Sequence, residues 1–425
     1  MRYIISYNQQ GTSYVDAKND IFRRGAFKVE KSPYYAITVR RYNILFRHIA
    51  WLQETQELYN EILLFYYRLY LDFFSEKQPG ALETLRTLEK MTIPGRDKQP
   101  VPYPLPWQKV PLYFRRAAIN AAIAAARSYL ARTDQASPTE HFTESVTFYK
   151  GMYRDYQESE ISLKLWTEAG WKWCRLRLRS NTAPTDGQMM SPSLVRKDNS
   201  YELHVPWKTP VQDGRNLKAR LESGEKICAA VFTGQDACIV CCILNGKGER
   251  ESCLFVKGGS KYAHACRQLW KKIDKSRSSG SQGNDPRANH RYWVKLKNLH
   301  EHYAHQFSRQ VIDYCQKHNV SILVLPEYDK EYARIIYGTA GPASPLRLSN
   351  SIREKLKYKG WQQGIVTTEV QQHDISSTCA LCGGKITQKK KGAEFICENG
   401  HRGNIYLNMA HNLGKKAKPV EKSHQ

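Results

Sequence analysis

The stretch that decides the fold lies towards the carboxyl end and reads YKGWQQGIVTTEVQQHDISSTCALCGG from Tyr358 to Gly384. A basic run follows, and then FICENGHRGNIYLNMAHNLG from Phe395 to Gly414. Two cysteines stand at C-x2-C spacing, a third follows after fourteen residues, and three residues separate that one from a histidine. This count and spacing predict a closed, tetrahedral structural zinc site with four ligands: Cys379, Cys382, Cys397 and His401.

Glycines and flanking patterns support a zinc ribbon at this place. Gly383-Gly384 and Gly400 stand where the two metal-binding knuckles must turn tightly. The apolar pattern of residues 364–370 predicts a strand before the ribbon, and residues 407–413 predict a helix after it. We therefore expect a ribbon inserted between a strand and a helix of a larger domain.

The composition indicates a nucleic-acid partner. The net charge is +25, from 65 Lys and Arg against 40 Asp and Glu, and such an excess attracts polyanions. The chain also holds 26 Tyr and 9 Trp, whose rings can stack on bases. An anionic membrane surface would attract the same charge, but we find no apolar run of about 18 residues and no amino-terminal signal pattern. Eleven scattered cysteines suit a reducing cytoplasm.

The first third of the chain predicts helices. Residues 1–33 are expected to form an extension of unknown role, and a strand follows at 34–39. Apolar residues recur at three- and four-residue spacing over 45–74, which predicts a long amphipathic helix, and a shorter one is expected at 84–91. Six prolines then interrupt residues 94–111, and an alanine-rich helix is predicted over 112–132.

The middle of the chain changes to alternating patterns. Between residues 148 and 211, short alternating segments separated by Gly, Pro, Asn and Asp predict a small antiparallel barrel. A basic strand face is expected there, because cations alternate with apolar positions; a phosphate-facing surface and an ordinary solvated face are both open. Its members are Lys164, Lys172, Arg175, Arg177 and Arg179.

The last half predicts an α/β domain. Residues 227–232 indicate a buried strand and 237–244 its hairpin partner, while 320–325 indicate a second buried strand that ends at Pro326-Glu327. Helices are expected at 292–318 and 347–359, and a mobile linker at 271–291. Strands followed by helices favour a central sheet.

The passage IREKLKYKGWQQGIVTTEVQQHDISSTCALCGG, residues 352–384, resembles the segment that leads into the zinc ribbon of TnpB, the guide-RNA nuclease of bacterial transposons. Compact type V CRISPR effectors share this segment. The helix at 45–74 and the motif SPSLVRKDNSYELHVP, residues 191–206, resemble the family's amino-terminal half. The resemblance covers about residues 34–415. It implies that the protein binds a structured guide RNA whose guide portion pairs with double-stranded target DNA.

The resemblance also implies a multidomain α/β fold. Residues 34–43 with 140–225 would form a wedge-like antiparallel β-barrel, into which residues 44–139 insert a helical recognition domain. Residues 226–375 with 404–425 would form a split RuvC-like (RNase H-like) domain, and 376–403 the inserted zinc ribbon. From the resemblance we also take Arg115 and Arg116, and the strand residues Arg175, Arg177 and Arg179, as contacts to RNA or heteroduplex backbone.

The chain departs from the family where a nuclease would hold its metals. RuvC nucleases bind two divalent metals with three acidic residues, one from each split segment. Phe232 occupies the first acidic position and Tyr406 the third, with Asn404 at an acidic position just upstream, while Glu327 alone is kept. The family's fourth ribbon cysteine is also missing, so His401 must complete the metal site.

Two functions follow from these departures. The first is an RNA-guided DNA-binding protein, nuclease-dead, that acts by occupying its target, as a transcription repressor does, or by recruiting another protein. The second is an RNA-guided DNA endonuclease with magnesium at a rebuilt site of Asp236, Asp329 and Asp374 around Glu327. A bacterial cytoplasmic location at the nucleoid is expected for both, and a monomer or a dimer remains open.

Overall fold

The structure is a computed structural model that describes residues 34–75, 79–95, 99–132, 137–180, 187–198, 200–211, 213–278, 289–390 and 393–417. The extension predicted at 1–33 lies outside these residues. The chain forms two compact units, the first built on Ile37–Thr209 and the second on the chain from Pro210 onward. Among the described helices, none has both the length and the apolar character that a membrane span requires.

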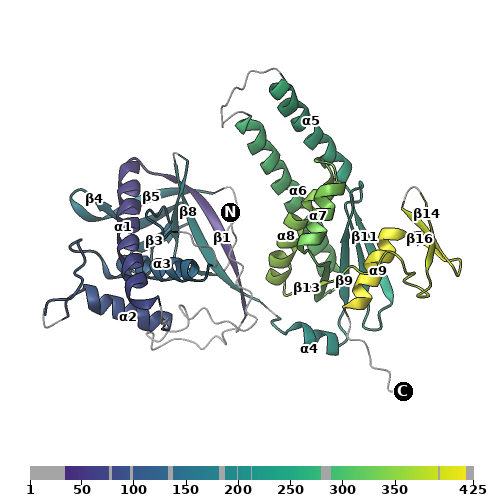
Figure 1. Ribbon diagram of the computed structural model, residues 1–425, viewed down its shortest axis with the longest axis horizontal. Coiled ribbons are helices and arrows are strands. Elements are labelled where there is room, and N and C mark those ends of the chain that lie inside the picture. The colour runs from purple at the N-terminus through teal and green to yellow at the C-terminus, as the bar shows by residue number, and fades with distance from the viewer. Residues whose placement is uncertain are drawn as a thin grey trace. The chain divides into compact units, whose positions relative to one another are not determined.

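The first unit is an antiparallel sheet with helices packed against it (Figure 1). The strand order is β2-β7-β8-β1-β5-β4-β3, and β6 pairs with β8. The strands are β1 (Tyr35–Leu45), β2 (Val146–Thr147), β3 (Tyr153–Gln157), β4 (Glu160–Thr167), β5 (Gly170–Arg179), β6 (Gln188–Met189), β7 (Ser193–Lys197) and β8 (Ser200–Pro210). The helices are α1 (Ile49–Phe74), α2 (Ala81–Thr92) and α3 (Leu112–Leu130).

The predicted antiparallel barrel is found as a half-barrel sheet in the described residues. The end strands β2 and β3 do not pair with each other in the part of the chain that the structure describes. β2 has only two residues, and the pairing of β3 with β4 is interrupted between Arg154 and Gln157. Helices α1 and α3 instead cover the inner face of the sheet, so the apolar side chains are buried without closure.

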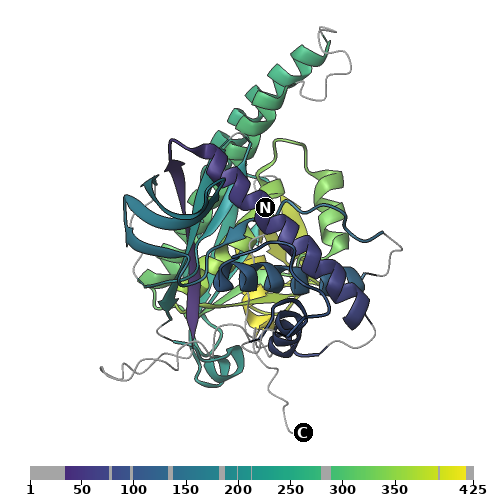
Figure 2. The same ribbon diagram turned by 90° about the vertical axis from the view of Figure 1, so that its left-hand side faces the viewer.

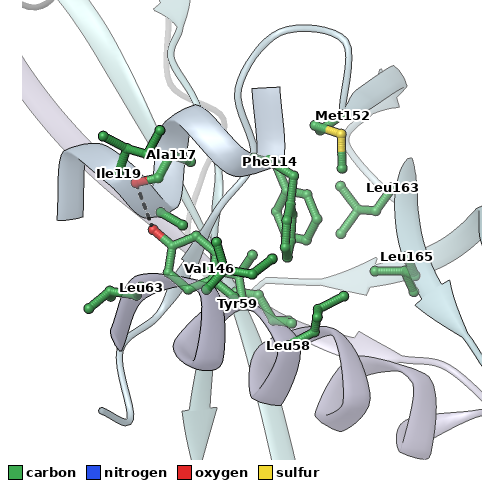
Figure 3. Close-up of a cluster of buried hydrophobic side chains, with 14 of the residues drawn as sticks. Leu58, Tyr59, Leu63, Phe114, Ala117, Ile119, Val146, Met152, Leu163 and Leu165 are labelled. Atoms are coloured by element: carbon green, nitrogen blue, oxygen red, sulfur yellow. Dashed lines mark hydrogen bonds between the residues drawn. The ribbon is translucent and has the colours of Figure 1, made fainter. Parts of the chain in front are cut away.

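The alanine-rich helix serves this packing. Ala118, Ala122 and Ala126 lie at four-residue spacing and are fully buried, which allows α3 to approach α1 closely. Figure 3 shows Phe114 of α3 and Tyr59 of α1 within the same cluster as residues of β4, and the Tyr59 hydroxyl donates to the carbonyl of Ala117 at 3.1 Å. The three helices therefore share one core with the sheet.

The second unit has a five-stranded sheet of order β11-β10-β9-β12-β13. Its strands are β9 (Ile227–Phe232), β10 (Ile239–Leu244), β11 (Arg250–Val256), β12 (Ile322–Pro326) and β13 (Val366–Val370). β9 to β11 form an antiparallel meander, while β12 runs parallel to both β9 and β13. The expected central sheet with buried parallel strands is confirmed.

Helices cover both faces of this sheet. They are α4 (Leu217–Glu222), α5 (Gly259–Ser278), α6 (His290–Lys317), α7 (Lys330–Thr339), the 3-10 turn η1 (Pro345–Leu348), α8 (Ser349–Gln362) and α9 (Ile405–Lys416). Alternate residues of β9 face α6 and α8 on one side, and α9 packs on the other side (Figure 1). This alternation explains why every residue of β9 is buried.

In the segment 271–291, predicted as a linker, the described residues 271–278 and 290–291 are helical, and residues 279–288 lie outside the described part of the chain. α5 continues to Ser278 and α6 begins at His290, so the described part of this segment is an extended helical pair. An apolar contact between α5 and α6 stabilises these helices, and the many basic residues of the segment obscured it in the sequence. Trp270 packs edge-on against Trp293 at 5.2 Å between ring centroids, and Ile273 is fully buried.

The ribbon follows β13 as a small three-stranded sheet. Its strands are β14 (Ile386–Lys390), β15 (Glu394–Cys397) and β16 (Arg402–Asn404), and β15 lies in the centre. A short cluster around Phe395 and Ile405 joins the ribbon to the first turn of α9. The predicted order of strand, ribbon and helix is confirmed.

Candidate functional site

Three thiols and one imidazole converge at the base of the ribbon. The donor atoms of Cys379, Cys382, Cys397 and His401 all lie within 4.8 Å of one another. The sulfurs of Cys382 and Cys397 are 3.8 Å apart, and His401 Nδ1 lies 3.5 Å from the Cys397 sulfur. Such distances leave room for one ion bound by all four donors.

Two tight turns of the backbone bring these donors together. In the first knuckle the amide of Gly383 donates to the carbonyl of Cys379 at 2.8 Å, and in the second the amide of Gly400 donates to that of Cys397 at 2.9 Å. Both glycines have left-handed backbone angles, with φ of +74° and +81°. Larger residues rarely adopt these angles, so the predicted role of the glycines is confirmed at both positions.

The chemistry of the donors fits zinc. The pKa of Cys382 is lowered to about 6, mainly by a hydrogen bond from the Asn399 side chain and then by one from the Gly384 backbone. Burial instead raises the pKa of Cys379, a cost that a bound cation would remove. Three sulfurs with one imidazole nitrogen form a tetrahedral set, so the group is compatible with zinc.

Asn408 of α9 makes hydrogen bonds to the first knuckle of the ribbon. Its Oδ1 accepts a hydrogen bond from the amide of Ala380 at 2.7 Å, and its Nδ2 donates to the carbonyl of Thr378 at 2.7 Å. Asn412, one turn later, donates to the same carbonyl at 2.8 Å. The position of the knuckle therefore depends on the helix that follows the ribbon.

A second group of side chains of interest lies at the carboxyl ends of β9 and β12. These strands pair in parallel, with Ile322 opposite Ile227 and Val324 opposite Ala229. Continuing this register places Glu327 level with Phe232. Phe232 is buried in the face that packs against α8, and the amide of Glu327 donates to Val370 of β13 at 2.9 Å. One carboxylate and one phenyl ring therefore occupy neighbouring strand ends.

The first turn of α9 reaches the loop that follows β9. The side-chain amide of Gln235 donates to the hydroxyl of Tyr406 at 3.5 Å, so Tyr406 lies near this loop. Asn404 is the N-cap of α9, and its Oδ1 accepts from the amides of Tyr406 and Leu407 at 3.0 and 3.1 Å. Sequence reasoning missed Gln235, because no spacing links it to a residue so distant in the chain.

The three alternative acids do not gather around Glu327. Asp236 accepts from the amide of Ser260 at the start of α5, and Asp329 caps α7 by accepting from the amide of Tyr332 at 2.7 Å. Asp374 holds its own turn in the segment before the ribbon, together with His373. Throughout the described ranges, the ribbon cluster is the one group of three or more His, Cys, Asp and Glu side chains close enough to share a metal ion.

The strand arginines predicted as phosphate contacts lie on one exposed face of β5. Arg175, Arg177 and Arg179 are exposed, whereas the residues between them point into the core. Trp173 continues this face and carries the guanidinium of Arg154 at 4.3 Å from its ring centroid. Arg175 also pairs with Glu160, and Lys164 of β4 lies opposite Trp173. Lys172 lies opposite the buried Leu165, so its predicted place on this face is wrong. The outer sheet face therefore presents closely spaced cations.

The arginines of α3 are held inside the first unit. Arg115 is nearly buried and pairs with Glu89 of α2 at 3.3 Å. Arg116 approaches the same carboxylate with two nitrogens, at 3.0 and 2.8 Å. This pairing gives both residues a structural role between two helices, and their contact with nucleic acid stays a prediction.

Two family models match the sequence. The first, the Aq_aa04 family, matches residues 34–167, and the second, the Cas12f1-like, TNB domain, matches residues 350–413. The second match spans α8, β13, the ribbon and most of α9. No protein of curated function matches the chain.

Solved structures share the fold over most of the chain. A Cas12f1 in complex with sgRNA and target DNA is 13% identical and covers 87% of this chain and 83% of its own, with a TM-score of 0.57. The mini-RNA-guided endonuclease CRISPR-Cas_phi3 is 8% identical and covers 91% and 93%, with a TM-score of 0.52. The fold is that of the compact type V effectors, which confirms the resemblance to TnpB and its relatives. Within that class, the carboxyl-terminal part of the chain resembles the Cas12f1-like proteins.

Proposed function

We propose that this chain is an RNA-guided DNA-binding protein that holds its target without cutting it. In this proposal a guide RNA pairs with one DNA strand, and the bound complex blocks other proteins or recruits one. The second unit acts as a RuvC-like domain that has lost its metal ligands. Its sheet supports this assignment, because three antiparallel strands, β11, β10 and β9, are followed by β12 and β13, which run parallel to β9. The sheet of the first unit acts as the wedge-like domain, with α1 to α3 as its helical recognition part.

The side chains at the positions expected for the metal ligands are the main support for this proposal. Two-metal hydrolysis needs several carboxylates to fix both ions and to align water with the leaving oxygen. Phe232 and Tyr406 offer none, and Glu327 alone leaves most inner coordination positions to water. Asn404 is a neutral cap of α9 and adds no charge. The site as built therefore supports binding and opposes metal-dependent cleavage.

The guide RNA is supported by the chemistry of the surface and by the relatives. The solved Cas12f1 that shares this fold is described with sgRNA and target DNA. The net charge of +25 and the exposed arginines of β5 suit a large polyanion. In such a complex, base pairing supplies the sequence recognition, while arginine–phosphate contacts fix position. Acting on DNA, the protein would work at the bacterial nucleoid.

Zinc has a structural part in this proposal. Cys379, Cys382, Cys397 and His401 would hold one ion, which stabilises a ribbon too small to bury a core of its own. The hydrogen bond between Asn408 and Ala380 then fixes the ribbon relative to α9. Magnesium would take part only if the acidic site were rebuilt, and each of the three candidate acids is already used in a local cap or turn.

The test uses the protein purified together with its RNA. Sequencing of the bound RNA supplies the guide, and DNA matched to it is then incubated with the complex in magnesium and in manganese. We expect a gel shift that depends on the RNA, and no cleaved product. A random population of cellular RNA fragments would contradict guided recognition.

Cleavage would overturn the second half of the proposal, provided that it belongs to this chain. Cutting that depends on the guide and is abolished by Glu327→Ala or Asp236→Ala would reveal a rebuilt acidic site. Cutting that survives both substitutions would identify a contaminating nuclease. Glu331→Ala, an exposed acid in the first turn of α7, is the matched control.

A further inference from the structure

The helical pair α5–α6 extends beyond the sheet of its own unit, as both views of the ribbon show (Figures 1 and 2). Its distal part is held together by its own apolar seam. Trp270 packs against Trp293, and Ile273 and Leu296 are buried between the helices. Arg277 adds a cation–π contact at 5.7 Å from the Trp293 ring. The pair is therefore built as a stiff projection.

One side of α5 carries a row of cations. Arg267, Lys271 and Lys275 follow one another at four-residue spacing, and all three are exposed. A rise of 1.5 Å per residue places successive members about 6 Å apart along one helix face. Across the whole of α5, six Lys and Arg (Lys261, Arg267, Lys271, Lys272, Lys275, Arg277) stand against the single acid Asp274.

The three cations of this row differ from other charged residues of the second unit in their ion pairing. None of its three cations pairs with a carboxylate in the described parts of the chain, although ion pairs are present elsewhere in the same unit. Arg309 pairs with Asp313, and Lys355 pairs with Glu301. Like charges at four-residue spacing destabilise a helix. An anionic partner would remove this cost.

The form of the row favours a duplex over a single strand. Single strands are held by aromatic rings on which bases stack. Trp270 of α5 instead packs edge-on against Trp293 of α6, and the Trp293 ring also carries the guanidinium of Arg277. A straight line of long, flexible cations fits a regular phosphate backbone whose bases are already stacked inside.

We propose that the row of Arg267, Lys271 and Lys275 binds the phosphate backbone of the target DNA duplex, independently of its sequence. The inference rests on the proposed function, because it takes DNA as the target, and it adds a binding surface on α5. The duplex is favoured over the guide RNA because the three cations form a straight row along one stiff helix, which matches a regular phosphate backbone.

The test replaces the three cations by glutamine, as Arg267→Gln, Lys271→Gln and Lys275→Gln in one protein that is purified with its RNA. The control, Lys247→Gln with Lys317→Gln and Lys330→Gln, removes the same charge from exposed positions outside α5. Binding of matched DNA is measured by fluorescence anisotropy at several salt concentrations. We expect the α5 variant to lose affinity on the order of 100-fold at 0.1 M salt, and its slope of log affinity against log salt to fall by about 2 to 3.

Each other outcome has a separate meaning. Equal slopes in the α5 variant and the control would overturn the inference while leaving the proposed function intact. Loss of the co-purified RNA from the α5 variant would assign the row to RNA and also overturn it. Failure of the unmodified complex to bind matched DNA would instead contradict the proposed function. Circular dichroism checks that the variant remains folded.

Discussion

The side chain of Asn408 accepts a hydrogen bond from the backbone amide of Ala380 at 2.7 Å, across the boundary between α9 and the first knuckle of the ribbon. Asn408 is nearly buried, so water cannot replace this bond. The residue thereby couples the turn that carries Cys379 to the helix that carries Tyr406, the residue that we expect at one of the family's metal positions. The first knuckle of the ribbon and the first turns of α9, which the sequence analysis treated separately, are thus linked by this hydrogen bond.

We expect Asn408→Ala to destabilise this junction. The amide of Ala380 would lose its partner in a buried place, which costs about 1 to 3 kcal/mol, while the Thr378 carbonyl would keep its bond from Asn412. Urea denaturation measures the change. Asn298→Ala, at an exposed position of α6, is the control and should change stability by less than about 0.5 kcal/mol. Equal stability of the two variants would contradict the coupling.

Cys382→Ser should remove the metal. Elemental analysis is expected to find roughly one zinc per chain in the parent protein and much less in the variant, because a serine hydroxyl is a poor zinc ligand. Local unfolding of the ribbon should follow, seen as faster proteolysis between β14 and α9. The control Cys253→Ser changes an exposed thiol outside the group and should keep its zinc. Full zinc occupancy in the Cys382 variant, or none in the parent, would sink the assignment.

Substitutions of the arginines of β5 should affect RNA binding, whereas a substitution in α3 should affect the stability of the fold. Replacing Arg175, Arg177 and Arg179 by glutamine is expected to lower the amount of co-purified RNA without a large loss of stability, because all three side chains are exposed. Arg115→Ala should instead destabilise the fold by about 2 to 4 kcal/mol, because it leaves the partly buried Glu89 with one partner fewer.

Thermal denaturation and quantified RNA content distinguish the two classes of arginine. A β5 variant that unfolds early, with normal RNA content in its folded fraction, would show that the sheet face is structural. An Arg115 variant with full stability and little RNA would restore this residue to the binding surface. Lys218→Gln, at an exposed position of α4, provides a charge control outside both sets.

Stability should depend on pH through His305 on α6. Burial, and then the neighbouring cations Lys355 and Lys359, lower the pKa of His305 from 6.5 to about 4. Between these values the unfolded chain binds the proton that the folded chain refuses, so stability should rise with pH from about 4 to 6.5. His305→Gln should flatten this part of the curve, whereas His264→Gln, at an exposed position of α5, should not. Parallel curves for His305→Gln and the parent protein would refute the assignment.

Much of the local structure could be predicted from the sequence because it depends on nearby residues. The spacing of Cys379, Cys382, Cys397 and His401 predicted the cluster, since tight turns bring together donors that are three or four residues apart. Periodicity predicted α1, α3 and the alternating face of β5. In the described part of 271–291 the linker prediction was wrong. Ile273 is buried and Trp270 packs against Trp293 of α6, a partner that lies beyond any local window.

The sequence by itself determined the ribbon ligands, the main helices and strands, and the lack of carboxylates at Phe232 and Tyr406. Only the tertiary structure decided how the charged residues are used. Glu89 holds Arg115 and Arg116 between α2 and α3, and Asp236 accepts a hydrogen bond from the amide of Ser260, 24 residues further on, at the start of α5. The physical reason is that an ion pair or a cap depends on distances of about 3 Å between atoms, and for residues far apart in the chain those distances are set by packing rather than by spacing.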